Sequence, residues 1–149
     1  MSRLQACFAR LQAEDRKALI PYIMTGDPHP EVTVPLMHAM VKAGANIIEL
    51  GAPFSDPMAD GPVIQAAAER ALEFHITMDD VFKAVKQFRR LDDVTPIVIM
   101  GYLNLIEVAG YGAFARLASE AGIDGVITVD MPPEEAHDYI SALEGESLD

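Results

Sequence analysis

The chain has 149 residues, 50% of them hydrophobic, which is enough to bury the core of one ordinary domain. Its formal net charge of -12 at pH 7 argues against nucleic acid or an anionic membrane as a partner, and no apolar run is long enough to span a bilayer. With a single cysteine, no zinc-type cysteine–histidine spacing and no signal-peptide core, a reduced, cytoplasmic protein without a metal site is expected.

Helix-like and strand-like segments alternate along the chain. Residues 2 to about 17 have apolar side chains at helical spacing, with Ser2 as a candidate N-cap. Apolar strands are expected at residues 18–24, 47–50, 97–100 and 126–129. Helices are expected at about residues 30–43, from about 62 through 71, after Thr77 through Phe88, at about 112–121 and from Pro132 onward. Apolar strands joined by helices indicate a parallel sheet with helices packed on it.

Two segments resemble each other, residues 43–51 and 121–130. Each has Ala-Gly at a helix end, a polar turn residue, an apolar strand and then an acidic residue. This repeat predicts a (β/α)8 TIM barrel, of which the chain holds only the first four βα units and an extra N-terminal helix. We therefore expect residues 1–149 to form a single partial TIM-barrel domain that lacks its C-terminal half, most simply because the chain is a fragment.

Among the three carboxylates in the run from Ile47 to Pro62, Glu49 and Asp60 are the candidates for chemistry. Glu49 ends an apolar strand, where a charge is costly to bury unless it is paired or takes part in chemistry. Asp60 follows a proline-rich loop and precedes Gly61. Carboxylates in different environments are suited to separate acid–base and electrostatic roles. The alternatives are that Glu49 pairs with a basic side chain and that Asp60 is an ordinary turn residue.

Four motifs in the same order resemble the tryptophan synthase alpha subunit family. The most specific is Glu-Leu-Gly-Ala-Pro-Phe-Ser-Asp-Pro-Met-Ala-Asp-Gly-Pro at residues 49–62. The others are Pro-Tyr-Ile-Met-Thr-Gly-Asp-Pro at 21–28, Met-Gly-Tyr-Leu-Asn at 100–104 and Gly-Val-Ile-Thr-Val-Asp-Met-Pro-Pro-Glu at 125–134. The resemblance implies a lyase of tryptophan biosynthesis that cleaves indole-3-glycerol phosphate to indole and glyceraldehyde 3-phosphate by a retro-aldol reaction.

The resemblance also implies roles for individual residues. Glu49 would transfer protons, and Asp60 would stabilise the positive charge that develops on the indole ring. Four strand residues would line the indole slot, although simple core packing is the alternative for each: Tyr22, Met100, Ile127 and Val129. The expected interface residues are Pro53, Asp56 and Asn104, and Leu105 departs from the family pattern, in which proline is usual at that position.

The expected partner is the tryptophan synthase beta subunit in an alpha2beta2 assembly. No cofactor is expected in this chain, since pyridoxal phosphate would belong to the beta subunit, and the phosphate-binding loops would lie in the absent half. Three other interpretations stay open: a lyase that works without a beta partner, a non-catalytic activator of the beta subunit, and a fragment with no activity. The presence of both Glu49 and Asp60 argues against a purely binding role.

Overall fold

The computed structural model of the chain describes residues 2–149. Its four parallel strands form one sheet in the order β1-β2-β3-β4, with bounds Tyr22–Met24, Ile48–Gly51, Ile97–Gly101 and Gly125–Thr128. Strands that follow one another in sequence are neighbours in the sheet, which is the order of a βα barrel; a doubly wound sheet reverses direction. The predicted fold class is confirmed: the chain forms four consecutive units of a (β/α)8 barrel after a leading helix.

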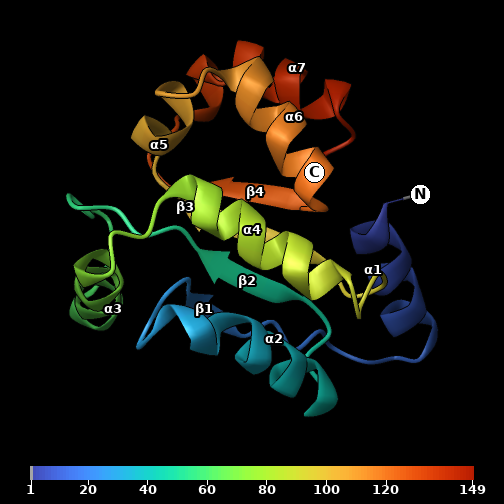
Figure 1. Cartoon of the computed structure of the whole chain (residues 1–149). Helices are drawn as coiled ribbons and strands as arrows, with labels where there is room; N and C mark the ends of the chain where they lie inside the picture. The colour runs from blue at the N-terminus through green and yellow to red at the C-terminus, as the bar shows by residue number, and fades with distance from the viewer. Residues whose placement is uncertain (1) are drawn as a thin grey trace.

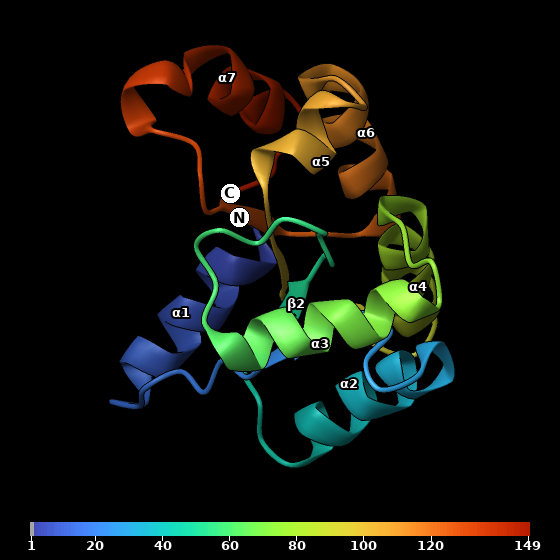
Figure 2. The ribbon, with the colours of Figure 1, turned by 90° about the vertical axis from the view of Figure 1, so that its left-hand side faces the viewer.

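The α-helices of residues 2–149 are α1 Arg3–Ala13, α2 Thr33–Lys42, α3 Pro62–Glu73, α4 Met78–Arg89, α5 Leu103–Glu107, α6 Tyr111–Ala121 and α7 His137–Gly145. Of these, α2, α4 and α6 cover one face of the sheet. Figures 1 and 2 show α2, α4 and α6 side by side along the sheet, with α7 against α6. Ile48, Leu50 and Ile99 point from the strands into the core between sheet and helices, where they pack with Phe88 and Phe114. These five side chains are at most 1% exposed, so this layer is the main hydrophobic core.

The other face of the sheet is covered only near its ends. At the ends where the strands begin, α1 buries Cys7 and Leu11 against Ile47. At the ends where they finish, α3 packs small side chains such as Ala68 against Met24. Figure 1 shows α1 and α3 at these opposite ends. The middle of this face, which would point into the interior of a closed barrel, holds the residues discussed below.

Most helix starts agree with their sequence signals. The Ser2 hydroxyl accepts a hydrogen bond from Gln5 N–H at 3.2 Å, so Ser2 is the N-cap of α1 as predicted. Thr77 precedes α4, and its N–H donates to the Asp80 carboxylate at 3.0 Å. The predicted helix from residue 30 begins as a 3-10 turn at Pro30–Val32 and becomes α-helical at Thr33.

The first strand is shorter than predicted, because only residues 22–24 pair with β2. The N–H of Leu19 donates to the Asn46 side chain at 2.9 Å, and its carbonyl accepts from Asn46 N–H at 2.9 Å. The backbone N–H and carbonyl of Leu19 therefore find their hydrogen-bond partners in the side chain and backbone of Asn46, and not in a neighbouring strand.

A charged cluster closes the sheet at the ends where the strands begin. The Asp124 carboxylate, 4% exposed, accepts from Arg3 at 2.9 Å and from Arg89 at 2.7 Å. It also accepts from Ile97 N–H at 2.8 Å, which ties the cluster to β3. Asp149 continues the ladder beside it: its N–H donates to the Asp124 carbonyl at 2.9 Å, and its carbonyl accepts from Val126 N–H at 3.0 Å. This end of a barrel serves stability, since barrel enzymes carry their chemistry at the opposite end.

Candidate active site

The strand register brings the predicted slot residues onto one face of the sheet. Tyr22 stands opposite Glu49 across β1 and β2, and Met100 stands opposite Ile127 across β3 and β4. Residues opposite each other in neighbouring strands share a face, as do residues two apart in one strand, so Tyr22, Glu49, Met100 and Ile127 lie on the same face. Val129 lies just past the end of β4, where its N–H donates to the Gly101 carbonyl at 3.1 Å. This is the face away from α2, α4 and α6, whose core is filled by the alternate residues such as Ile48 and Ile99. Four of the predicted site residues, Tyr22, Glu49, Met100 and Ile127, are therefore brought onto one face by the strand register.

Glu49 lines a largely apolar cavity of about 290 Å³. The same cavity is lined by Ile47, Val98 and Ile127 from the sheet side and by Phe8 from α1. The ion pairs and side-chain hydrogen bonds found among residues 2–149 include none made by the Glu49 carboxylate, so pairing with a basic side chain does not account for it. Burial raises the pKa of Glu49 above its ordinary value of 4.5. A carboxyl group whose pKa is raised in this way is suited to take and give a proton in acid–base catalysis.

Tyr22 stands opposite Glu49 in the sheet and is close enough to Asp60 to be influenced by its charge. Its hydroxyl passes over Gly51, where a Cβ would overlap the phenol, so the sequence requires glycine at this position. Burial raises the pKa of Tyr22, and the charges of Asp60 and Glu49 raise it further. The phenol therefore stays protonated at neutral pH and adds a polar group to an otherwise apolar surface.

Asp60 ends the loop between β2 and α3, and two side chains outside the loop hold this end. The hydroxyl of Tyr102, which follows β3, accepts a hydrogen bond from Ala59 N–H at 2.9 Å. The Gln65 side chain donates to the Asp60 carbonyl at 2.8 Å. Within the loop, Asp60 N–H donates to the Pro57 carbonyl at 3.1 Å. This is the geometry expected if Asp60 is an ordinary turn residue, which was the alternative to a catalytic role. The loop places Asp60 near Tyr22, and hence on the side of the sheet where Glu49 lies.

Comparison with known proteins assigns this arrangement to a family. A family model described as tryptophan synthase alpha chain matches residues 8–149. The chain belongs to the tryptophan synthase alpha chain family. The tryptophan synthase alpha chain of Thioalkalivibrio sulfidiphilus is 60% identical over 149 residues, which are 100% of this chain and 56% of that protein. The one from Methylococcus capsulatus is 58% identical over the same length and share.

Solved structures of the family have the same fold as this chain. The crystal structure of tryptophan synthase subunit alpha from Legionella pneumophila superposes with a TM-score of 0.98 at 54% identity, over 99% of this chain and 56% of that one. A structure of the tryptophan synthase a2b2 complex from Pyrococcus furiosus gives a TM-score of 0.83 at 40% identity, over 88% of this chain and 55% of that chain. The chain thus spans about 56% of the length of the curated tryptophan synthase alpha chains above.

The residues expected at an interface lie in the segments that follow β2 and β3. Asp56 is exposed and accepts a hydrogen bond from the Ser55 hydroxyl at 2.7 Å. Asn104 is also exposed and lies within α5, which was not predicted. Pro53 is buried beneath the loop and lines a cleft of about 350 Å³ together with Val108. Asp56 and Asn104 therefore offer exposed polar groups to a partner, whereas Pro53 is buried and offers none.

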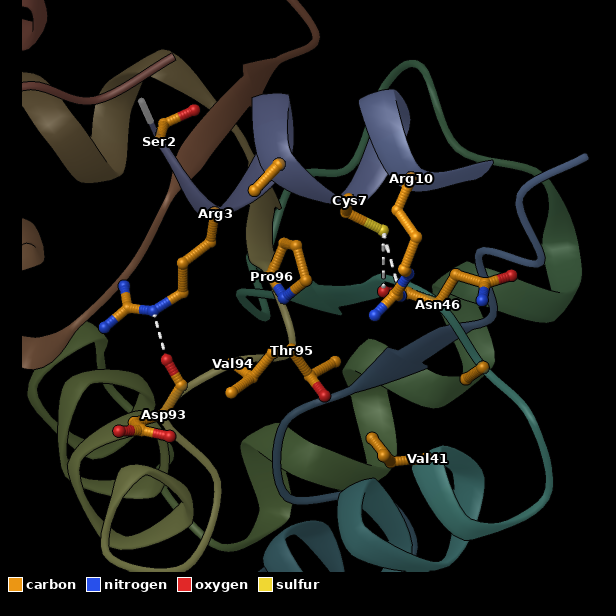
Figure 3. Close-up of a pocket in the computed structure, with 12 residues that line it drawn as sticks. Ser2, Arg3, Cys7, Arg10, Val41, Asn46, Asp93, Val94, Thr95 and Pro96 are labelled. Atoms are coloured by element: carbon orange, nitrogen blue, oxygen red, sulfur yellow. Dashed lines mark hydrogen bonds between the residues drawn. The ribbon is translucent and has the colours of Figure 1, made fainter. Parts of the chain in front are cut away.

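A larger cleft, of about 620 Å³, lies at the other end of the sheet, beside α1. Figure 3 shows Arg3 donating to the Asp93 carbonyl and Cys7 directed at the Asn46 carbonyl. Cys7 is 5% exposed and packs with Leu11, so it serves as a packing residue. The cleft is remote from Glu49 and Asp60, at the end where barrel enzymes carry structural residues.

Residues 2–149 contain neither a candidate metal site nor a candidate membrane span. No group of three or more histidine, cysteine, aspartate or glutamate side chains in this range is arranged to hold a metal ion. Within the same range, no helix has the length and apolar character needed to cross a membrane.

Proposed function

We propose that the full-length protein cleaves indole-3-glycerol phosphate to indole and glyceraldehyde 3-phosphate. The observation that carries the proposal is an unpaired, half-buried Glu49 on the apolar barrel face, with Asp60 held nearby by its loop. Family membership supports the same reaction. A flat aromatic ring is suited to the surface formed by Met100 and Ile127, because such a ring presents few polar groups.

Glu49 performs the proton transfers of the proposed reaction. Protonated Glu49 gives its proton to C3 of the indole ring, which makes the ring a competent leaving group. The resulting carboxylate takes the proton of the glycerol hydroxyl next to the scissile bond, and a carbonyl forms there. The electron pair of the broken carbon–carbon bond returns to the ring. Indole and the aldehyde are released and Glu49 is again protonated, so the cycle needs a carboxyl group with both states accessible.

Asp60 acts electrostatically in this scheme. The indole ring becomes positively charged once C3 is protonated, and an ionised Asp60 beside the ring nitrogen stabilises that charge. The proposed reaction proceeds by proton transfer through side chains, so we include no metal or organic cofactor in it. We further propose that the phosphate is bound by residues outside this chain, and that a beta subunit carrying pyridoxal phosphate completes an alpha2beta2 assembly.

The test is indole release by the full-length protein supplied with indole-3-glycerol phosphate. Glu49→Gln keeps the shape of the side chain but cannot transfer a proton, so turnover should be lost while the substrate still binds. Asp60→Asn should also be severely impaired, since it removes the charge that opposes the cation. Glu120→Gln, an exposed substitution on α6, is the matched control and should behave as wild type. Turnover of Glu49→Gln within about tenfold of wild type would overturn the assignment.

A further inference from the structure

Tyr102 is the buried residue on which the Asp60 loop rests. It directly follows β3, is 1% exposed, and its ring centroid lies 5.2 Å from that of Phe54 at a tilt of 30°. Its hydroxyl accepts the hydrogen bond from Ala59 N–H at 2.9 Å. In Figure 2 the loop between β2 and α3 crosses in front of the chain that leads from β3 into α5, and this hydrogen bond joins the two. Tyr102 therefore holds the loop near its start and beside Asp60.

The phenol is also close to the Asp60 side chain. Burial raises the pKa of Tyr102, and the charge of the neighbouring Asp60 carboxylate raises it further. A phenol can accept and donate at the same time. While its oxygen accepts from Ala59 N–H, its O–H remains available as a donor to the carboxylate of the next residue, Asp60.

The sheet fixes Tyr102 itself. The N–H of Leu103, the next residue, donates to the Asp130 carboxylate at 2.7 Å. Asp130 lies just beyond β4, so the chain that leaves β3 is tied to the end of the neighbouring strand. The backbone of Tyr102 is thus set by two strands of the sheet, whereas the loop it supports is exposed at Ser55, Asp56 and Met58. A rigid element holds a segment that lacks secondary structure of its own.

We propose that Tyr102 is a positioning residue for Asp60, which its hydroxyl keeps at the rim of the barrel face where the indole ring would bind. This inference rests on the proposed function, since Asp60 matters for turnover only if the cation forms. The hydroxyl acts through the loop and does not touch the reacting atoms. Loss of the hydroxyl should therefore slow the chemical step and leave binding of the substrate largely intact.

The experiment compares Tyr102→Phe with wild type in the full-length protein. The substitution keeps the ring against Phe54 and removes the only atom that accepts from Ala59 N–H in this contact. The kcat for indole release should fall by about tenfold or more while KM changes by less than about threefold, because misplacing a group by an ångström costs up to a hundredfold. Tyr111→Phe is the matched control: it loses a hydroxyl that donates to Glu107 at 2.8 Å, outside the site, and should retain wild-type kinetics.

A second measurement reads the loop directly. Amide hydrogen exchange at Ala59 and Asp60 should be at least about tenfold faster in Tyr102→Phe than in wild type, and unchanged in Tyr111→Phe. An unchanged exchange rate, or faster exchange with a wild-type kcat, would overturn the positioning role. If the wild-type protein releases no indole at all, the proposed function fails, whereas exchange at Ala59 still decides whether Tyr102 holds the loop.

Discussion

Tyr22 and Glu49 stand directly opposite each other in β1 and β2, and the Tyr22 hydroxyl extends past Glu49 to lie over Gly51. The phenol covers part of the barrel face on which the carboxylate lies, and it does so without forming an ion pair with it. Glu49 is half-buried on this face, and the desolvation of its carboxylate raises its pKa.

Glu49→Gln should stabilise the full-length protein at neutral pH. The pKa of Glu49 in the folded protein is raised above 4.5, so ionising it costs more free energy in the folded state than in the unfolded state. This cost is absent below the unfolded-state pKa and grows as the pH rises from the unfolded-state pKa to the folded-state pKa. Above the folded-state pKa it is constant at its full value. The melting temperature of Glu49→Gln should exceed that of wild type at pH 7, and the gap should close near pH 4. A gap that widens on acidification would contradict the sign of the shift.

Gly51→Ala should destabilise the protein by about 1–3 kcal/mol, the usual cost of overpacking. A Cβ at position 51 overlaps the Tyr22 hydroxyl and lies 2.7 Å from the ring carbon that bears it, so the phenol must move. Gly112→Ala is the matched control, because a Cβ there meets nothing within 4 Å. Replacing Tyr22 by leucine should relieve the overlap, so the double variant should be less destabilised than the sum of the single changes. Additive free energies of unfolding would show that the two residues do not interact.

The strand positions of the site were predictable from sequence, whereas the position of Asp60 was not. Alternation along a strand puts residues 127 and 129 on one face, and the motif at residues 49–62 marks Glu49. The end of the loop that carries Asp60 is held by Tyr102, 43 residues further along the chain, and no local pattern encodes that contact. A weak signal existed: Tyr102 comes directly after a strand, at the end of a barrel where functional side chains gather.

The unpredicted helix α5 has a similar cause. Its five residues, Leu103–Glu107, are too few to show helical periodicity, and they have no capping residue of their own in the sequence. Its first N–H is satisfied by Asp130, 27 residues away. The ion pair between Arg89 and Asp124 was missed for the same reason, because it joins α4 to the residue before β4. Long-range polar contacts of this kind follow from the assembled fold and not from local propensity.

Asp56→Ala should weaken mutual activation between the full-length protein and a tryptophan synthase beta subunit. The Asp56 carboxylate is exposed, and its side-chain hydrogen bond within residues 2–149 is the one from the neighbouring Ser55 hydroxyl. Removing the carboxylate should therefore leave the loop intact. The backbone bond from Asp60 N–H to Pro57 and the Tyr102 contact both remain. Indole release by the isolated protein should therefore stay within about twofold of wild type, since exposed substitutions have small effects. Stimulation by added beta subunit should fall.

The matched control for the interface is Glu120→Ala, which removes an exposed charge from α6. It should respond to the beta subunit as wild type does. If Asp56→Ala is stimulated as strongly as Glu120→Ala, Asp56 has no part in the interface. If the wild-type protein never responds to a beta subunit and none co-purifies with it, the protein acts without such a partner.

Residues 1–149 expressed by themselves should be inactive and should self-associate. The barrel face around Glu49 is open in this chain: Ile127 is 43% exposed and Phe8 is 49% exposed. The outer edge of β1 offers unpaired backbone groups, and the outer edge of β4 is paired only with Asp149. Exposed apolar surface and open strand edges favour association with other chains. Light scattering coupled to size exclusion should therefore report oligomers or aggregates, and the indole-release assay should show no turnover. Adding a polypeptide with the remaining units of the barrel should restore a monodisperse species. A cooperative monomer from residues 1–149 alone, with measurable turnover, would mean that four βα units complete both the fold and the site.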